Sequence, residues 1–373
     1  MQQTYERRVG YVVSNDLVKV SSLLPSNKNR SLLVHSLVKA FGLLSTDDAG
    51  LGVQSLPPSP AEFRELSAYH DRDFLEHVLK EDVSTEDDAN EEFGLTEASG
   101  LGSLMDCPPF PQMRDYVKYV AGASLTAAKA LKEDKVDIAI CWDGGRHHAQ
   151  KAQASGFCYV ADCVLAILAL KRPQPSPDGG LTRPRVMYLD LDLHFSDGVS
   201  HAFHRSAAGS SSPQVLTLSL ARLSDPSDAG FDPFTLALPL ERGAGRGAFA
   251  RVWPLVERVR AAFRPDCVVV QCGADGLAGD PYATWNWSIG DGEGSMGWCV
   301  DRVCGWGCKV LLLGGGGYRS PNVARAWTYL TSVALGRPLP LDADIPDHGA
   351  FPLYAPHKNR DEYLVASKKT SQQ

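Results

Sequence analysis

The sequence lacks the features that mark several classes of protein. Among its 373 residues, no uninterrupted apolar run approaches the roughly 18 residues that a membrane-spanning helix needs. The N-terminal segment MQQTYERRVGYVVS has no apolar core long enough for a secretory signal. No internal repeat is visible. We therefore expect neither a membrane span nor a signal peptide.

Cysteine pairs with metal-binding or redox spacing are also missing. The chain has nine cysteines, an odd number, and no CxxC pair. Four of them lie inside apolar runs: Cys141, Cys163, Cys267 and Cys272. This usage favours reduced, buried thiols in a reducing compartment over a disulfide framework.

An excess of basic residues is absent as well. The formal net charge is −7, whereas direct nucleic-acid binding needs a concentrated basic face. No basic cluster typical of nuclear import stands out. The charge excludes a nucleic-acid-binding protein more readily than an enzyme, and it is compatible with a cationic, lysine-rich substrate.

What the sequence does contain is an alternation of buried strands and helices. Short runs rich in aliphatic residues predict strands at Val9–Val13, Val136–Trp142, Val186–Leu193, Val215–Leu220, Cys267–Gly273 and Val310–Leu313. Helical patterns lie between them, at Tyr116–Leu131, Tyr159–Leu170 and Gly247–Phe263. We expect an α/β fold in which residues 1–373 form a single domain. Its core is one open, mostly parallel sheet with helices on both faces.

Reactive side chains gather where four of these strands end. The four segments are Asp143–His148, Asp190–Asp197, Gly273–Asp275 and Gly314–Tyr318. In open α/β sheets the active site lies beyond the carboxyl ends of the strands. Histidines, carboxylates and a tyrosine are therefore expected to meet at one edge of the sheet.

Three of these side chains have the pattern of a metal site. Asp192 and His194 are two residues apart, so on a strand both point to the same face, and Asp275 adds a carboxylate from another strand. Zinc accepts imidazole nitrogen and carboxylate oxygen, and a catalytic zinc keeps a position open beside three protein ligands. The alternative is that Asp192 and His194 only cap a strand end. The neighbouring histidines and glycines favour metal binding.

The tandem histidines His147 and His148 suggest acid–base chemistry. Asp190 and Asp197 could each accept a hydrogen bond from one Nδ1–H, which would fix the tautomer and raise the basicity of the ring. The alternative is an ordinary polar loop.

The glycines before Tyr318 lack the spacing of a phosphate-binding loop, and they would let the backbone approach the metal.

Taken together, the motifs resemble those of class I zinc-dependent histone deacetylases, in the arginase–deacetylase superfamily. The segments that carry the resemblance are RVGYVVS, NRSLLVHSL, SAYHDRDFLEHV, MDCPPF, WDGGRHHAQK, ASGFCYVADCVLAIL, YLDLDLHFSDGV, QCGADGLAGDP, LLLGGGGYRSPNVARAWTYLT and IPDH. They extend over nearly the whole chain. The resemblance implies zinc-dependent hydrolysis of N-acetyl-lysine on histones or other proteins, with release of acetate. It also implies a place in chromatin regulation and transcription repression, in the nucleus, the cytoplasm or both, with a corepressor complex as a possible partner.

The resemblance also implies roles for individual residues. One zinc would be held by Asp192, His194 and Asp275. His148 would be the general base and later the general acid, and His147 would be its electrostatic partner. Asp190 and Asp197 would support the two histidines. Tyr318 would donate a hydrogen bond to the developing oxyanion. The substrate would be bound by Gly156, Phe157 and Gly316 in the acyl-lysine tunnel and by Asp106 at its rim. A potassium ion would lie near Asp190, Asp192, His194, Ser219 and Leu220, with a second site that includes Phe203.

The chain departs from the family pattern at three places. Arg146 replaces a bulky apolar residue before the tandem histidines, and Phe195-Ser196 follows His194 where the family has histidine and glycine. The segment that supplies the second aromatic wall of the tunnel is shortened to Ser224–Leu240, in which Phe231 is a possible substitute. The shortening predicts acceptance of acyl groups bulkier than acetyl.

Three alternative functions would need residues or properties that differ from those of a protein deacetylase. An arginase-like two-metal hydrolase needs a second carboxylate two residues after Asp275, where this chain has Leu277. Deacetylation of small acetylpolyamines is harder to exclude. A catalytically weak, acetyl-lysine-binding scaffold of a corepressor complex is disfavoured because a pure binder has no need of His147, His148 and Tyr318.

Overall fold

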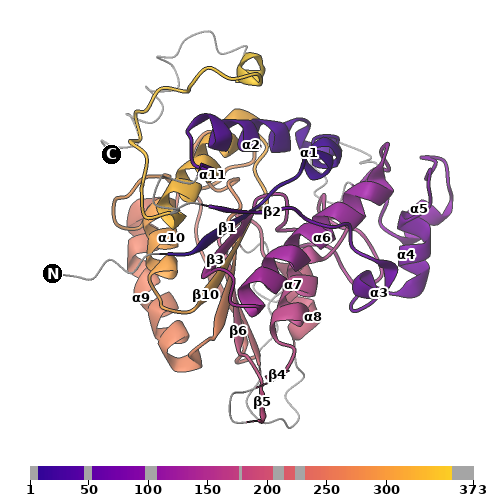
Figure 1. The fold of residues 1–373 in the computed structure, drawn as a ribbon, viewed down its shortest axis with the longest axis horizontal. Helices are drawn as coiled ribbons and strands as arrows, with labels where there is room; N and C mark the ends of the chain where they lie inside the picture. The colour runs from indigo at the N-terminus through magenta and orange to yellow at the C-terminus, as the bar shows by residue number, and fades with distance from the viewer. Residues whose placement is uncertain are drawn as a thin grey trace.

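An eight-stranded parallel sheet forms the centre of the computed structural model, which describes residues 7–45, 53–96, 107–175, 179–204, 214–222 and 232–354 (Figure 1). The strand order is β2-β1-β3-β10-β9-β6-β7-β8, and every neighbouring pair is parallel. The strands are β1 Val9–Val12, β2 Gln54–Leu56, β3 Ile138–Cys141, β6 Val186–Asp190, β7 Val215–Ala221, β8 Thr235–Pro239, β9 Cys267–Gln271 and β10 Lys309–Leu313. The predicted parallel sheet is thereby confirmed.

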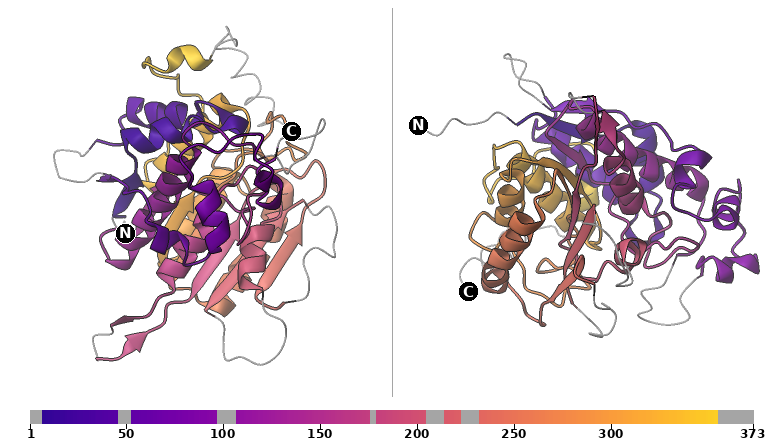
Figure 2. Two further views of the ribbon diagram at one scale, coloured as in Figure 1. Left: turned by 90° about the vertical axis from the view of Figure 1, so that its right-hand side faces the viewer. Right: turned by 90° about the horizontal axis from the view of Figure 1, so that it is seen from below.

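Helices cover both faces of the sheet, as Figures 1 and 2 show. One face carries α1 Asn15–Ser21, α6 Met113–Lys132, α7 Asp162–Leu170 and α8 Asp197–Phe203. The other carries α2 Arg30–Ala40, α9 Arg246–Phe263, α10 Met296–Cys304 and α11 Ser320–Ala334. The short elements are η1 Pro25–Asn27, α3 Phe63–Leu66, α4 Arg72–Val78, α5 Ala89–Glu92 and η3 Phe351–Tyr354.

The alternation of side chains along each strand divides the core into two layers. In β9, Val268 and Val270 pack on the α9–α11 side, whereas Val269 packs on the α6–α7 side. In β10, Leu312 packs on the α9–α11 side and Leu311 packs on the α6–α7 side. Because both faces are buried, these strands are continuous apolar runs without a polar alternation.

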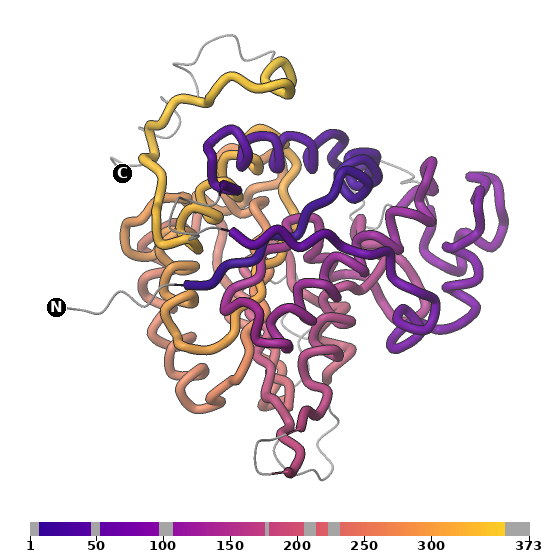
Figure 3. Tube along the Cα trace, viewed as in Figure 1, coloured from indigo at the N-terminus to yellow at the C-terminus, as the bar shows by residue number. Residues whose placement is uncertain are grey.

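Two parts of the chain extend from this body. A small antiparallel pair, β4 Gln174–Pro175 with β5 Leu181–Thr182, projects from its lower end in Figure 3. Helices α3 to α5 lie in a separate group beyond α6 (Figures 1 and 3). In the described part of the chain, no helix is both long enough and apolar enough to cross a membrane.

The two-layered core makes a stability prediction. Leu311 is fully buried in β10, so Leu311→Ala should lower the free energy of unfolding by about 2–5 kcal/mol, through lost burial and the cavity it leaves. Leu341 is 44% exposed, and Leu341→Ala should change the free energy of unfolding by less than about 0.5 kcal/mol. Urea denaturation of the two variants measures the difference; equal effects would contradict the packing described.

Candidate active site

The reactive side chains lie on loops that leave four adjacent strands. The loop after β3 carries the tandem histidines, and the loop after β10 carries the glycine-rich segment and Tyr318. The loop after β9 carries Asp275, and the loop after β6 carries Asp192 and His194. Neighbouring parallel strands are about 4.8 Å apart and all run in one direction. Their carboxyl ends therefore bring these loops together at a single edge, although the residues are far apart in the sequence.

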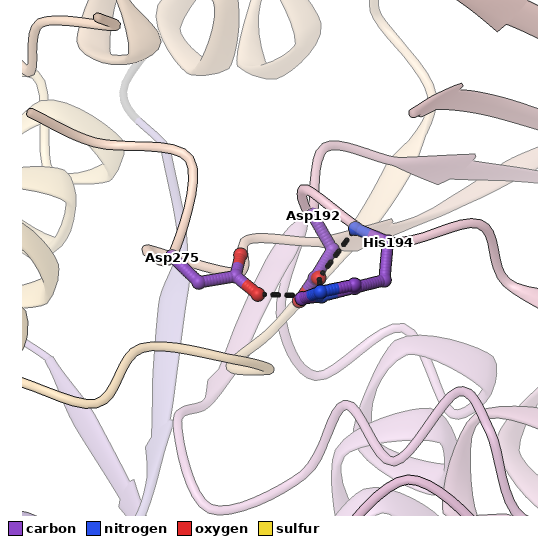
Figure 4. Close-up of side chains that lie close together, drawn as sticks. All are labelled: Asp192, His194 and Asp275. Carbon is purple, nitrogen blue, oxygen red and sulfur yellow. Dashed lines mark hydrogen bonds and ion pairs between the residues drawn. The ribbon is translucent and has the colours of Figure 1, made fainter. Parts of the chain in front are cut away.

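Asp192, His194 and Asp275 form a compact cluster. Each offers one ligand atom, and these atoms all lie within 4.8 Å of one another. The Nδ1 atom of His194 is 2.9 Å from Asp275 Oδ2 and 3.3 Å from Asp192 Oδ1. Figure 4 shows the carboxylate of Asp275 pointing toward the other two side chains. In the described part of the chain this is the single group of three such side chains that could hold a metal ion.

The two carboxylates of this cluster are fully buried close to each other. Burial, and then the negative charge of Asp192, raise the pKa of Asp275 to about 7. Two acids crowded in this way are stabilised by a cation between them. The cluster therefore has the electrostatic character of a cation site.

Donors and glycines hold Asp192 in place. Its Oδ2 accepts hydrogen bonds from Gln271 Nε2 at 2.8 Å and from the Gly316 N–H at 2.9 Å. A Cβ atom added to Gly273 would lie 2.0 Å from the same oxygen, and one added to Gly316 would lie 2.5 Å from Asp275 Oδ2. Both glycines thus leave the space that the carboxylates occupy.

Each tandem histidine is paired with a carboxylate. His147 Nδ1 lies 2.9 Å from Asp190 Oδ2, and His148 Nδ1 lies 2.6 Å from Asp197 Oδ1. Since an ionised carboxylate only accepts, each ring donates its Nδ1–H and leaves Nε2 free to face the site. The two rings are 4.0 Å apart, and His147 Nε2 is 3.8 Å from Asp192 Oδ1.

The two histidines are electrostatically different. Burial opposes a charge on His147, but Asp190 and Asp192 outweigh it and raise its pKa to about 9. Burial, and then the charge of His147, lower the pKa of His148. One imidazole is thus suited to carry a charge, and its neighbour to accept a proton.

A cavity lies beside the tandem histidines and Tyr318. Six of the predicted residues line it: His147, His148, Gly156, Phe157, Gly316 and Tyr318. The Phe157 ring packs edge-on against Tyr318 at 5.6 Å, and Phe157 has a positive φ of 63°, which is unusual for a bulky residue. A Cβ on Gly156 would lie 2.5 Å from the ring of His148.

Comparison with known proteins identifies the family. Residues 24–334 match the histone deacetylase domain. The chain is 37% identical to histone deacetylase 8 of Danio rerio over 365 residues, which cover 94% of this chain and 87% of that protein. It is 40% identical to histone deacetylase 8 of Xenopus laevis over 311 residues, which cover 80% and 87%. Histone deacetylase 2 of Oryza sativa subsp. japonica is 37% identical over 326 residues, which cover 84% and 58%.

The chain belongs to the histone deacetylase family. This family is zinc-dependent in general and acts on acetylated lysine, which agrees with the cluster of two carboxylates and one imidazole. The predicted resemblance is confirmed. The arginase-like alternative is not favoured, because Gly276 and Leu277 offer no further carboxylate beside Asp275.

Not every predicted residue lies in this histone deacetylase site. Asp106 and Phe231, predicted for the rim and the tunnel wall, are outside the described residues. Ser219 is in β7 beside Asp190, and its buried Oγ has no hydrogen-bond partner in the described part of the chain. Leu220 is the next residue of β7, and Phe203 is the last residue of α8.

Sequence reasoning missed several residues that shape the site. Gln271, at the end of β9, binds Asp192, and Tyr188 Oη donates to Asp190 Oδ2 at 2.5 Å. Asp280 accepts the Tyr318 N–H at 2.7 Å and anchors that loop. Arg30 donates from Nη1 to the Gly317 carbonyl oxygen at 2.9 Å. Gln271 gave a signal that could have been used, because a polar residue inside a fully buried strand needs a partner.

The close approach at Gly273 makes a prediction. Gly273 does not have a positive φ, so alanine is compatible with its backbone, but the added Cβ would displace the carboxylate of Asp192. Gly273→Ala should lower metal affinity by roughly 10- to 100-fold, the range found when the support of a ligand is disturbed. Gly247→Ala in α9, where an added Cβ would lie 3.8 Å from the Arg251 side chain, is the control. Metal titration of both proteins is decisive; full metal affinity in Gly273→Ala would contradict the geometry.

Proposed function

We propose that this chain is a lysine deacetylase that uses one zinc ion to hydrolyse the acetamide of N-acetyl-lysine on histones or other proteins. Family membership makes the chain a hydrolase that deacetylates lysine. The observation that carries the assignment of the site is the position of two histidine–carboxylate pairs and Tyr318 around the cluster of Asp192, His194 and Asp275. We further propose that residues 1–373 form one catalytic domain.

The donor set fits zinc. Asp192, His194 and Asp275 supply two oxygens and one nitrogen, the donor types that zinc accepts in catalytic sites with an open position. The glycines Gly273 and Gly316 keep the cradle clear of side chains. When bound, zinc would supply Lewis-acid polarisation of the substrate carbonyl and lower the pKa of a water molecule.

The tandem histidines move the protons. His148 Nε2 accepts a proton from the attacking water, since its Nδ1–H is fixed on Asp197. The same nitrogen then donates that proton to the departing lysine nitrogen when the C–N bond breaks. His147, held by Asp190, contributes positive charge beside the reacting centre. Acetate and free lysine are the products.

Tyr318 stabilises the oxyanion. Its backbone is held through Asp280, and its ring packs against Phe157 and against Tyr282, 4.6 Å away. These contacts fix the ring at the wall of the cavity, from which the hydroxyl donates a hydrogen bond to the carbonyl oxygen as negative charge develops.

Substrate, partner and ion assignments complete the proposal. Gly156, Phe157 and Gly316 line the tunnel for the acyl-lysine, and Asp106 and Phe231 contribute to its rim and wall. A potassium ion would be held near Asp190, Asp192, His194, Ser219 and Leu220, with a second site that includes Phe203. The Ser219 hydroxyl, which has no hydrogen-bond partner among the described residues, supports the first of these sites. The protein works in the nucleus, the cytoplasm or both, in a corepressor complex, without direct contact to nucleic acid or membrane.

A first test measures turnover and metal together. The purified protein should deacetylate acetyl-lysine peptides, contain one zinc per chain and lose activity to a zinc chelator. Asp275→Ala removes one of three ligands and should lose most of the zinc. Asp344→Ala, at an exposed position, should keep it. Two tightly held divalent metal ions per chain, found by elemental analysis, would overturn the mononuclear zinc site.

A second test separates an enzyme from a binding scaffold. Tyr318→Phe removes only a hydroxyl that acts on the transition state, so kcat should fall by about 10²–10³, equal to about 2.7–4 kcal/mol. Zinc content and peptide affinity should stay near those of the wild type. Tyr282→Phe, in the neighbouring ring, is the matched control. Unchanged kcat in zinc-loaded Tyr318→Phe would remove the tyrosine from the mechanism.

A further inference from the structure

Arg146 is a buried cation that the proposed mechanism does not use. It lies directly before the tandem histidines and is 5% exposed. Its Nη2 donates to the main-chain oxygen of Asp143 at 3.0 Å, and its Nε has no hydrogen-bond partner in the described part of the chain. Among the described residues it forms no ion pair with a carboxylate. Burial opposes its charge, but nearby groups that include Asp162 and Asp143 outweigh burial and hold the pKa of Arg146 above its usual value, so it stays charged without a direct carboxylate partner.

A second buried guanidinium adds to the positive charge. Arg30 binds the Gly317 carbonyl oxygen and lies over the ring of Trp327 at 4.8 Å, and it too has no ion pair among the described residues. Burial, and then the charge of Arg146, lower the pKa of Arg30 to about 10, and the pKa of Arg146 lies above its usual value, so both side chains are charged at neutral pH. Two cations thus share one buried region.

The nearby acids are engaged with other donors. Asp143 Oδ2 is 2.8 Å from His35 Nε2. Asp162 accepts a hydrogen bond from Ser124 Oγ at 2.5 Å and from the backbone N–H groups of Gly145 and Arg146 at 3.0 and 2.8 Å. Neither carboxylate is bound by the Arg146 guanidinium, which leaves unused N–H donors in a buried place.

The side chain that carries these donors belongs to the active-site region. Arg146 lines the same cavity as His147, His148, Phe157 and Tyr318. An acyl-lysine whose carbonyl meets the reacting groups there has the rest of its acyl chain inside that cavity. An acetyl group ends in a methyl, which offers a guanidinium nothing to bind. A chain that ends in a carboxylate offers an oxygen pair that matches the guanidinium fork.

We propose that Arg146 determines acyl specificity, and that the protein hydrolyses lysine acylated with a short dicarboxylic acid in preference to an uncharged acyl group of equal length. The proposal rests on the deacetylase function above. Water adds to the acyl carbon, the C–N bond breaks, the lysine nitrogen receives the proton, and a free dicarboxylate leaves. Malonyl-, succinyl- and glutaryl-lysine are the substrates of this class.

The test compares acyl groups of matched length. Peptides carrying malonyl-, succinyl- or glutaryl-lysine are each paired with propionyl-, butyryl- or valeryl-lysine, and the ratio of kcat/KM within each pair is measured. In the wild type the charged member should be preferred for at least one length. Arg146→Leu should lower that ratio by about 10- to 100-fold, as expected for lost charge-assisted hydrogen bonds. Arg146→Lys should lower it less, because the charge stays and the fork is lost.

Two controls exclude indirect effects. Arg319→Leu removes an exposed cation next to Tyr318 and should leave the ratio unchanged. Peptide affinity in the Tyr318→Phe background provides a readout other than turnover: the succinyl peptide should bind more tightly than the butyryl peptide, and Arg146→Leu should abolish the difference. Melting temperature and zinc content report whether each variant is folded.

The outcomes are distinguishable. A wild-type preference for the uncharged acyl group at all three lengths overturns the proposal, and it needs no variant to fold. An Arg146→Leu ratio equal to that of the wild type also overturns it. If no acyl-lysine peptide at all is hydrolysed by the zinc-loaded protein, the deacetylase function itself fails. Turnover of acetyl and butyryl peptides without a preference for the charged partners contradicts only the role of Arg146.

Discussion

The site depends on one constraint, which is that two carboxylates, Asp192 and Asp275, are buried side by side. Each loses its hydration, and each raises the cost of ionising the other. Hydrogen-bond donors of the surrounding chain partly replace the lost hydration. Gln271 Nε2 and the Gly316 N–H donate to Asp192, and the Leu193 N–H donates to Asp275 Oδ1 at 3.1 Å. Such an arrangement is stable when a divalent cation replaces the missing water, and that cation is what the proposed chemistry requires.

The parallel sheet explains how so many groups reach one place. Strands β3, β10, β9 and β6 are neighbours, and each one ends at the same edge. The strands are fully buried and mostly apolar, which makes the framework rigid, and the polar groups of the site lie mainly at their carboxyl ends, as Asp190 and Gln271 do, and in the loops that follow. Precise positions then come from backbone contacts, such as the bond between Asp280 and the Tyr318 N–H. Stability and function thus use different parts of the same strands.

The sequence predicted the central strands and the metal cluster because both follow from simple periodicities. It predicted less where tertiary contacts decide. The helix expected from Tyr159 begins at Asp162 instead, and the Tyr159 hydroxyl donates a long-range hydrogen bond to the Pro108 carbonyl oxygen at 2.7 Å, a contact that no local pattern indicates. The edge strand β2 spans only Gln54–Leu56, too short for a pattern, and becomes a strand by pairing with β1. Asp280 resembles any loop acid until the fold brings it to Tyr318.

The buried histidine–carboxylate pairs argue for turnover over simple binding. Asp190 accepts bonds from both His147 and Tyr188, all inside the core, and such a network is costly unless every member is satisfied. A pocket that only bound acetyl-lysine could be lined with apolar side chains and a few donors at lower cost. A chain that moves protons needs imidazoles with fixed tautomers and with different pKa values, as His147 and His148 have. The two buried histidine–carboxylate pairs are therefore accounted for by proton transfer, which a scaffold does not perform.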